Sequence, residues 1–166
     1  MNTAHWHLML NHFPMIGIII GVLILVAGYL LKKNSIVKQV ALGVFVFSAL
    51  TAIPAYLTGE GAEEAVENVA GISESTIEEH EEMGKTFAIL VGVLGVLALI
   101  ALIAERKKSK ASGILYTLVF ILAVITSIYA KQLGTSGGDI RHTEIRSDSV
   151  IQPQDGTSDS QEEKNE

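Results

Sequence analysis

The chain has 166 residues, of which 49% are hydrophobic and only 18% charged, and its mean hydropathy is +0.40. This composition excludes an ordinary soluble globule and indicates a membrane protein. The formal net charge is -6, but the last twenty residues, from Ser147, hold six acids and one lysine, so the rest of the chain is nearly neutral. A nearly neutral body lacks the basic face that nucleic acid requires. Because the chain has no cysteine, it also lacks disulfides and thiolate metal sites.

Four uncharged runs of 18 to 20 residues stand out: Phe13 to Leu31, Val40 to Leu57, Thr86 to Ala104 and Ala111 to Ala130. About 20 apolar residues in a helix cross the roughly 30 Å of hydrocarbon in a bilayer. A helix of a soluble bundle would carry a polar stripe, whereas these runs are apolar on all sides. The sequence therefore predicts an all-α integral membrane four-helix bundle over residues 1–146, in contact with lipid. From Ser147 onward the polar composition predicts a disordered acidic tail.

The positions of lysine and arginine predict the orientation of the chain in the membrane. The connection after the first run carries Lys32, Lys33 and Lys38, and that after the third carries Arg106, Lys107, Lys108 and Lys110. By the positive-inside rule both connections are cytoplasmic, so the two termini and the central loop are extracytoplasmic in a multi-pass membrane protein. The first run is not a cleavable signal peptide, because its basic residues follow the apolar stretch.

The segments outside the spans carry further local patterns. A helix from a Thr3 cap would place His5, Met9 and His12 on one face and His7 with Asn11 on another. The segment from Thr58 to Gly71 predicts a short amphipathic helix at the outer surface, and Ser75-x-x-Glu78 predicts the start of the third long helix. After Lys131, a stretch with three glycines predicts a turn back over the outer mouth of the bundle.

The acidic loop and a pair of glycines each suggest a further interpretation. Nine carboxylates and no cation lie between Thr58 and Gly84, which indicates either a solvated acidic cap or a surface that attracts cations. Gly17 and Gly21 form a G-x-x-x-G pair, which favours close packing of the first span against a neighbouring helix.

The histidines are the candidate functional residues of this chain. His5, His7 and His12 precede the first span, His80 precedes the third and His142 follows the fourth, so all five fall on the predicted outer side. We expect His12, His80 and His142 to converge on a cofactor, because imidazole ligates transition metals and serves as an axial ligand of haem b. His5 and His7 are further candidate metal ligands, ranked lower because on a helix they point about 200° apart.

The surroundings of the histidines refine this hypothesis. Gly84, Phe87 and Val91 follow His80 on one helical stripe, and Gly84 leaves room either for a planar cofactor or for a neighbouring helix. Nucleophilic sites have no support, since there is no cysteine and no serine in a recognisable elbow. No catalytic residue is assigned, and whether the protein is an enzyme stays open.

Several short motifs together form a recognisable set. They are the N-H-F-P of Asn11 to Pro14, the T-G-E of Thr58 to Glu60, His80, and Gly137-Gly138 leading into the I-R-H-T-E-I of Ile140 to Ile145. Over residues 1–146 the chain resembles a family of uncharacterised bacterial four-helix inner-membrane proteins. Some relatives of that architecture are joined to iron–sulfur or cytochrome modules, so the resemblance implies a redox setting. The resemblance also implies a place in the bacterial inner membrane. It implies no settled activity, and we expect no such module in this chain.

Three functional hypotheses remain. The first is a haem- or metal-bearing electron carrier that exchanges protons with a quinol or an outer redox partner. The second is a metal-ion binding or transport accessory whose acidic loop gathers cations. The third is a scaffold without a cofactor, and a homo-oligomer is open in each case. The absence of charged residues from the runs counts against an ion path through the membrane.

Overall fold

The computed structural model describes residues 2–31, 35–67 and 72–141. Four long helices make up most of it, and each covers a predicted apolar run to within one residue: α2 (His12–Leu30), α3 (Ser35–Leu57), α5 (Glu74–Arg106) and α6 (Ser112–Arg141). All four are long and apolar enough to cross a membrane. They confirm an all-α, multi-pass membrane bundle. The predicted tail and His142 lie outside the described residues.

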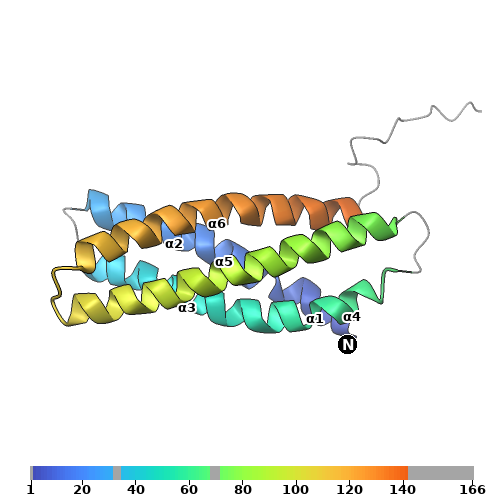
Figure 1. Cartoon of the computed structure of the whole chain (residues 1–166), viewed down its shortest axis with the longest axis horizontal. Helices are drawn as coiled ribbons and strands as arrows, with labels where there is room; N and C mark the ends of the chain where they lie inside the picture. Colours follow the sequence, from blue (N-terminus) through green and yellow to red (C-terminus); the bar gives the residue numbers. More distant parts are fainter. Residues whose placement is uncertain (1, 32–34, 68–71, 142–166) are drawn as a thin grey trace, which may run out of the picture.

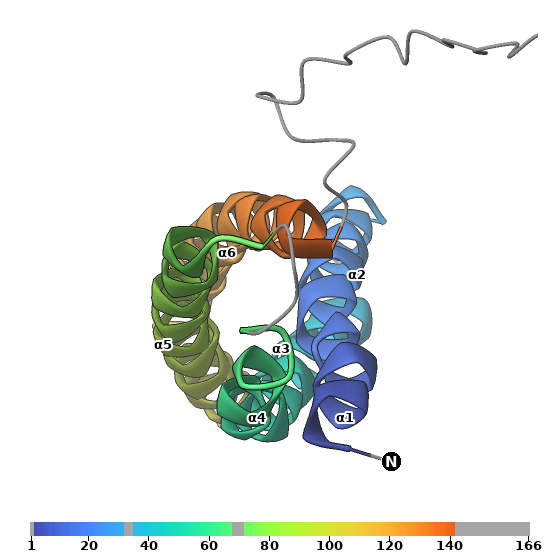
Figure 2. The same ribbon diagram turned by 90° about the vertical axis from the view of Figure 1, so that its right-hand side faces the viewer.

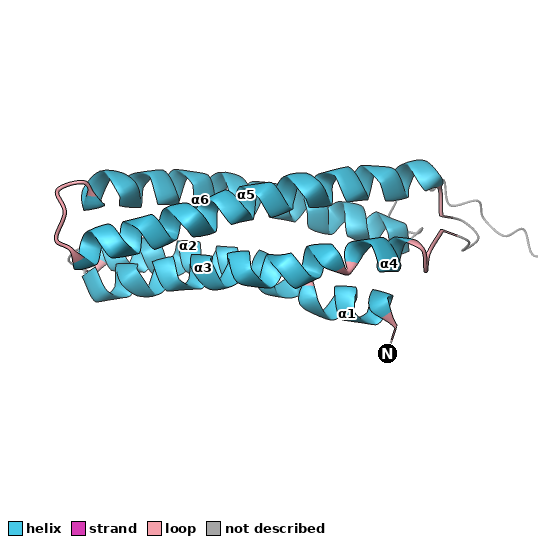
Figure 3. Cartoon of the chain, turned by 60° about the horizontal axis from the view of Figure 1, so that its bottom comes forward, coloured by secondary structure: helices cyan, strands magenta, loops and turns pink. Residues whose placement is uncertain are grey.

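The four long helices form a closed ring of antiparallel neighbours (Figures 1 and 2). Helices α2, α3, α5 and α6 pack on one another in chain order, and α6 returns to α2. One end carries α1 (Thr3–Leu10), α4 (Gly59–Glu63), the start of α5 and the end of α6. We call it the histidine end, and the opposite end, with the α2–α3 and α5–α6 connections, the basic end. Figure 3 shows α1 and α4 beside each other at the histidine end, where they are in contact.

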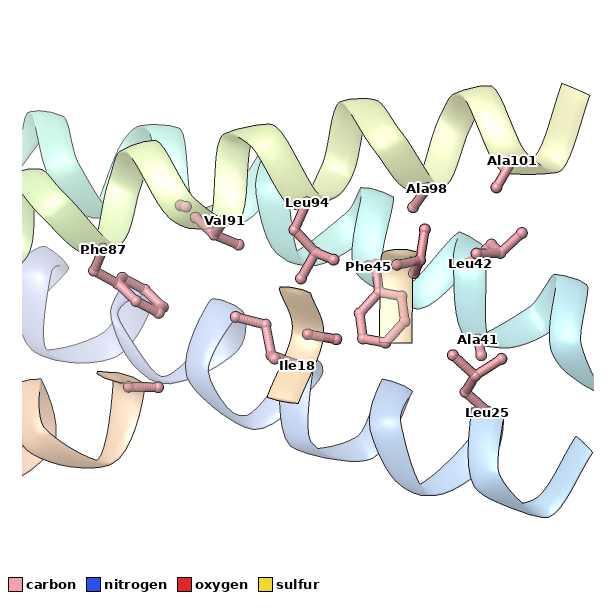
Figure 4. Close-up of a cluster of buried hydrophobic side chains, with 14 of the residues drawn as sticks. Ile18, Leu25, Ala41, Leu42, Phe45, Phe87, Val91, Leu94, Ala98 and Ala101 are labelled. Carbon is pink, nitrogen blue, oxygen red and sulfur yellow. The ribbon is translucent and has the colours of Figure 1, made fainter. Parts of the chain in front are cut away.

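The inner faces of the helices form one apolar core (Figure 4). Ile18 of α2, Phe45 of α3 and Leu94 of α5 have no exposed surface. On the outer faces large apolar side chains are exposed, among them Leu23 and Ile89. Because lipid is as apolar as these side chains, burial alone does not hold the helices together, and close packing must do so.

Small residues provide that close packing between α2 and α3. A Cβ at Gly17 would collide with Oγ of Ser48, and one at Gly21 would lie 2.5 Å from the Phe45 ring. Any larger residue at either position would push the two helices apart. The G-x-x-x-G pair is therefore a helix contact, as predicted.

Two predicted helix starts are wrong by one or two residues. Helix α1 is capped by Asn2 and not by Thr3, since the Asn2 side chain accepts from the backbone N–H of His5 at 3.1 Å. Helix α5 is capped by Ser73, whose Oγ accepts from the N–H of Thr76, and Ser75 already lies in its first turn. Asn2 and Ser73 have the extended backbone that an N-cap needs, which the residues inside a helix lack.

Two predicted connections also differ from the structure. The amphipathic helix expected up to Gly71 is the short α4, which ends at Glu63 and passes into turns through Glu67; residues 68–71 lie outside the description. The expected glycine-hinged return after Lys131 is wrong, because α6 remains helical to Arg141. Each glycine inside a helix costs about 1 kcal/mol relative to alanine. Here Gly134 and Gly137 accept close contacts from Met15 and His80, so packing outweighs the local preference.

Candidate functional site

The histidine end extends beyond the membrane-spanning part of the bundle. Helix α5 has 33 residues. At about 1.5 Å per residue such a helix is roughly 50 Å long, against a hydrocarbon layer of roughly 30 Å. Its apolar run begins at Thr86, so the preceding turns, with His80, lie outside the membrane-spanning segment.

His7 points from α1 onto the end of α3. Its ring is half-buried, and Nδ1 lies 2.9 Å from the backbone oxygen of Ala55. The last carbonyls of a helix have no partner within the helix, and the His7 ring and the Thr58 hydroxyl, 3.0 Å from the same oxygen, satisfy this one. A carbonyl oxygen only accepts, so Nδ1 of His7 donates. Neutral His7 therefore keeps the lone pair of Nε2 free to bind a ligand.

His80 points from α5 onto the end of α6. Its Nδ1 lies 3.3 Å from Oγ of Ser136, and its Cε1 lies 3.0 Å from the place that a Cβ of Gly137 would occupy. Burial lowers the pKa of His80 below its ordinary 6.5, and the charge of His7 lowers it further. The two imidazoles are thus close enough to repel each other as cations. Near neutral pH His80 is uncharged, which is the form that binds metals.

Asn11 follows His7 by one turn on the same face. Its Oδ1 is buried and has no hydrogen-bond partner among the described residues. Buried polar atoms are nearly always partnered, so this oxygen needs a donor that the described part of the chain does not supply. A metal ion or a water held by one would satisfy it.

His5 and His12 occupy the other face of the N-terminal segment. Both are exposed, and Nδ1 of His12, at the start of α2, donates to the carbonyl of Leu8 on α1 at 2.9 Å. The prediction that His5, Met9 and His12 share one face, apart from His7 and Asn11, is confirmed. The structure places His80 within electrostatic range of His7, and it shows no contact of His12 with His80. His142 lies outside the described residues, so its place in the expected trio stays a prediction.

The inward position of His7 could have been predicted from periodicity. The buried positions of α2 include Pro14, Gly17, Ile18 and Gly21. Extending that stripe backwards by steps of three or four residues reaches Asn11 and then His7. The signal was present in the sequence, but it required α1 to continue the inward face of α2.

Acidic side chains surround this end. Burial raises the pKa of Glu63 on α4, and the charges of Glu81 and Glu67 raise it further, so the acids of α4 and α5 face one another. One cation among them, Lys85, pairs with Glu81 at 2.8 Å. Within residues 2–31, 35–67 and 72–141 no group of three or more His, Cys, Asp or Glu side chains could hold a metal ion. A metal site here would need ligands of another type beside the two imidazoles.

Comparisons with models of protein families, with curated proteins and with solved structures find no match to this chain. The resemblance to the four-helix inner-membrane family stays an expectation based on its short motifs.

Proposed function

We propose that this integral membrane protein binds a transition-metal ion at its histidine end, through Nε2 of His7 and Nε2 of His80. The observation that carries the proposal is that two half-buried imidazoles from separate hairpins lie within electrostatic range of each other, each with Nδ1 hydrogen-bonded to the bundle. Metal-ligating histidines typically have such a bond, because it orients the ring and directs the other nitrogen at the metal. For His80, the tautomer that donates to Ser136 leaves Nε2 free in the same way.

The acidic surroundings support the same proposal. The carboxylates of α4 and α5 around Glu63 and Glu81 raise the local concentration of cations at the mouth of the site. The redox setting implied by the resemblance suits a transition metal, and we propose an electron-transfer or metal-handling role on the extracytoplasmic face of the bacterial inner membrane.

Haem is the second candidate, and one observation favours it. A Cβ at Gly84, one turn after His80, would meet no atom of a neighbouring element within 4 Å among the described residues. This open space lies next to His80. His80 would hold a haem bound there, and the haem would supply one-electron chemistry.

One preparation tests both candidates. The full chain is purified in detergent, its visible spectrum is recorded, and its metal content is measured before and after titration with Cu⁺, Co²⁺ and Zn²⁺. We expect stoichiometric metal binding that His7→Ala or His80→Ala weakens by at least about tenfold, since even the loss of a supporting partner costs a metal site about 10–100-fold. His5→Ala and His12→Ala are matched controls, because they remove the same side chain from the exposed face.

Two results would overturn the metal proposal. One is a preparation that binds none of the three ions. The other is equal loss of binding in all four variants, which would indicate nonspecific adsorption by histidine. A Soret band abolished by His80→Ala would instead establish haem.

A further inference from the structure

Two methionines face the same end of the bundle as His7 and His80. Met15 follows Asn11 by one helical turn, so His7, Asn11 and Met15 form one stripe down α1 and α2. Met83 follows His80 by three residues on α5. Both methionines are partly buried against the core cluster.

Met15 and His80 both contact helix α6. The terminal methyl of Met15 lies 3.0 Å from the place of a Cβ at Gly134, and the His80 ring lies at the same distance from that of Gly137. Positions three apart on a helix are neighbours, with about 5–6 Å between their Cβ atoms. Met15 and His80 thus contact adjacent turns on one face of α6. Glycine at both positions lets the two side chains approach the helix.

We propose that the histidine end is a copper(I) site in which the thioethers of Met15 and Met83 complete the ligand set begun by the imidazoles of His7 and His80. This proposal rests on the metal-binding function proposed above and names its metal.

Ligand chemistry selects copper(I). Zinc sites in proteins are built mainly from three or four Cys, His, Asp or Glu ligands, and the described part of the chain offers no such group. Thioether sulfur is a soft ligand that suits Cu(I), and imidazole suits copper as well. The chain has no cysteine, so methionine is its only source of soft sulfur. A site of two imidazoles and two thioethers would hold Cu(I) and bind Zn²⁺ only through the imidazoles.

The polarity of the site favours the monovalent ion as well. Met15 and Met83 lie toward the apolar core, so a metal bound between them and the histidines is partly removed from water. Transferring a charge from water is costly, and less so for one charge than for two. The acids of α4 and α5 lie nearby and offset part of the remaining charge.

The experiment measures Cu(I) and Zn²⁺ affinities of the full chain in detergent, using competition with chromogenic chelators under anaerobic, reducing conditions. The variants are Met15→Leu, Met83→Leu and the double variant, because leucine retains the volume of methionine and removes its sulfur. Met9→Leu is the matched control, since Met9 is 45% exposed on the outer face of α1. Thermal unfolding of each variant establishes that it is folded.

We expect the double Met15/Met83 variant to lose at least about tenfold in Cu(I) affinity, the range seen when metal sites lose a contributing group. Zn²⁺ affinity and the Met9→Leu control should be unchanged. Copper-edge X-ray absorption should show a sulfur shell that the double variant lacks.

Unchanged Cu(I) affinity in the double variant, with binding still lost in His7→Ala and His80→Ala, would overturn the copper(I) proposal and leave the metal site standing. Equal losses for Cu(I) and Zn²⁺ in a folded double variant would overturn it too, since they would point to a distorted site without sulfur ligation. Absence of any metal binding by the unaltered chain would overturn both proposals.

Discussion

The ring of His80 lies in the space that a side chain at Gly137 would need, with Cε1 3.0 Å from the position of the missing Cβ. We expect Gly137→Ala to displace the ring and to weaken metal binding by about tenfold or more. The control is Gly113→Ala on the same helix, where an added Cβ meets no neighbouring atom within 4 Å in the part of the chain that the structure describes. That variant should bind metal normally and unfold at the same or a higher temperature, because alanine favours a helix by up to about 1 kcal/mol. Normal metal binding by Gly137→Ala would show that the ring position does not matter.

Ser136 orients the same imidazole through its hydroxyl, 3.3 Å from Nδ1. Ser136→Ala should lower metal affinity by about 10–100-fold with little change in unfolding temperature, as the loss of an orienting hydrogen bond does in metal sites. The neighbouring Thr135→Ala serves as control, since Thr135 is exposed and its hydroxyl bonds to the carbonyl of Lys131 at 3.1 Å. A similar effect of both substitutions would assign the loss to helix destabilisation.

Substitutions of histidines that share one site should have coupled effects on metal affinity. We expect the effects of His7→Ala and His80→Ala on metal affinity to be non-additive in a double-mutant cycle, because removal of either ligand already breaks the centre. The cycle of His12→Ala with His80→Ala should be additive, since His12 is exposed and its ring bonds to the backbone of Leu8, four residues before it. His142→Ala belongs in the same series. A loss of affinity equal to that of His80→Ala would place His142 among the ligands.

Packing of α2 on α3 can be tested away from the site. Gly21→Ala should lower the free energy of unfolding by about 1–3 kcal/mol, the usual cost of overpacking. The added Cβ would lie 2.5 Å and 2.8 Å from two atoms of the fully buried Phe45 ring. Gly43→Ala on α3 is the control, because no neighbouring atom of residues 2–31, 35–67 and 72–141 lies within 4 Å of its added Cβ. Thermal or denaturant unfolding in detergent measures both variants, and equal stability would contradict the close contact.

The lysines and arginines of the basic end predict the orientation of the protein in the membrane. A reporter that is active only in the cytoplasm should be silent when fused after Glu166 and active when inserted after Lys108, because lysine and arginine of short loops stay in the cytoplasm. Lys107 and Lys108 are exposed in the α5–α6 connection. The opposite pattern would place the histidine end in the cytoplasm and remove the extracytoplasmic part of the proposed role.

Sequence alone determined the four long helices, since uninterrupted apolar runs of this length have one stable solution in lipid, a helix that bonds its own backbone. It also determined the two faces of α1, because the 3.6-residue period fixes which histidines share a side. The G-x-x-x-G pair of Gly17 and Gly21 was readable for a similar reason, as it lies within an apolar run where helix packing is the ordinary use of glycine.

Tertiary structure decided which face of α1 turns inward. His7, and not His12, lies within electrostatic range of His80, because α1 continues the buried stripe of α2 and places His7 on the Ala55 carbonyl at the end of α3. It also decided the form of the glycine-containing segment after Lys131. Glycine permits both a hinge and a close contact, so its local preference leaves the choice open. Met15 and His80 fill the space beside Gly134 and Gly137, and the segment remains helical to Arg141. These contacts join residues more than fifty positions apart in the chain, which no local pattern encodes.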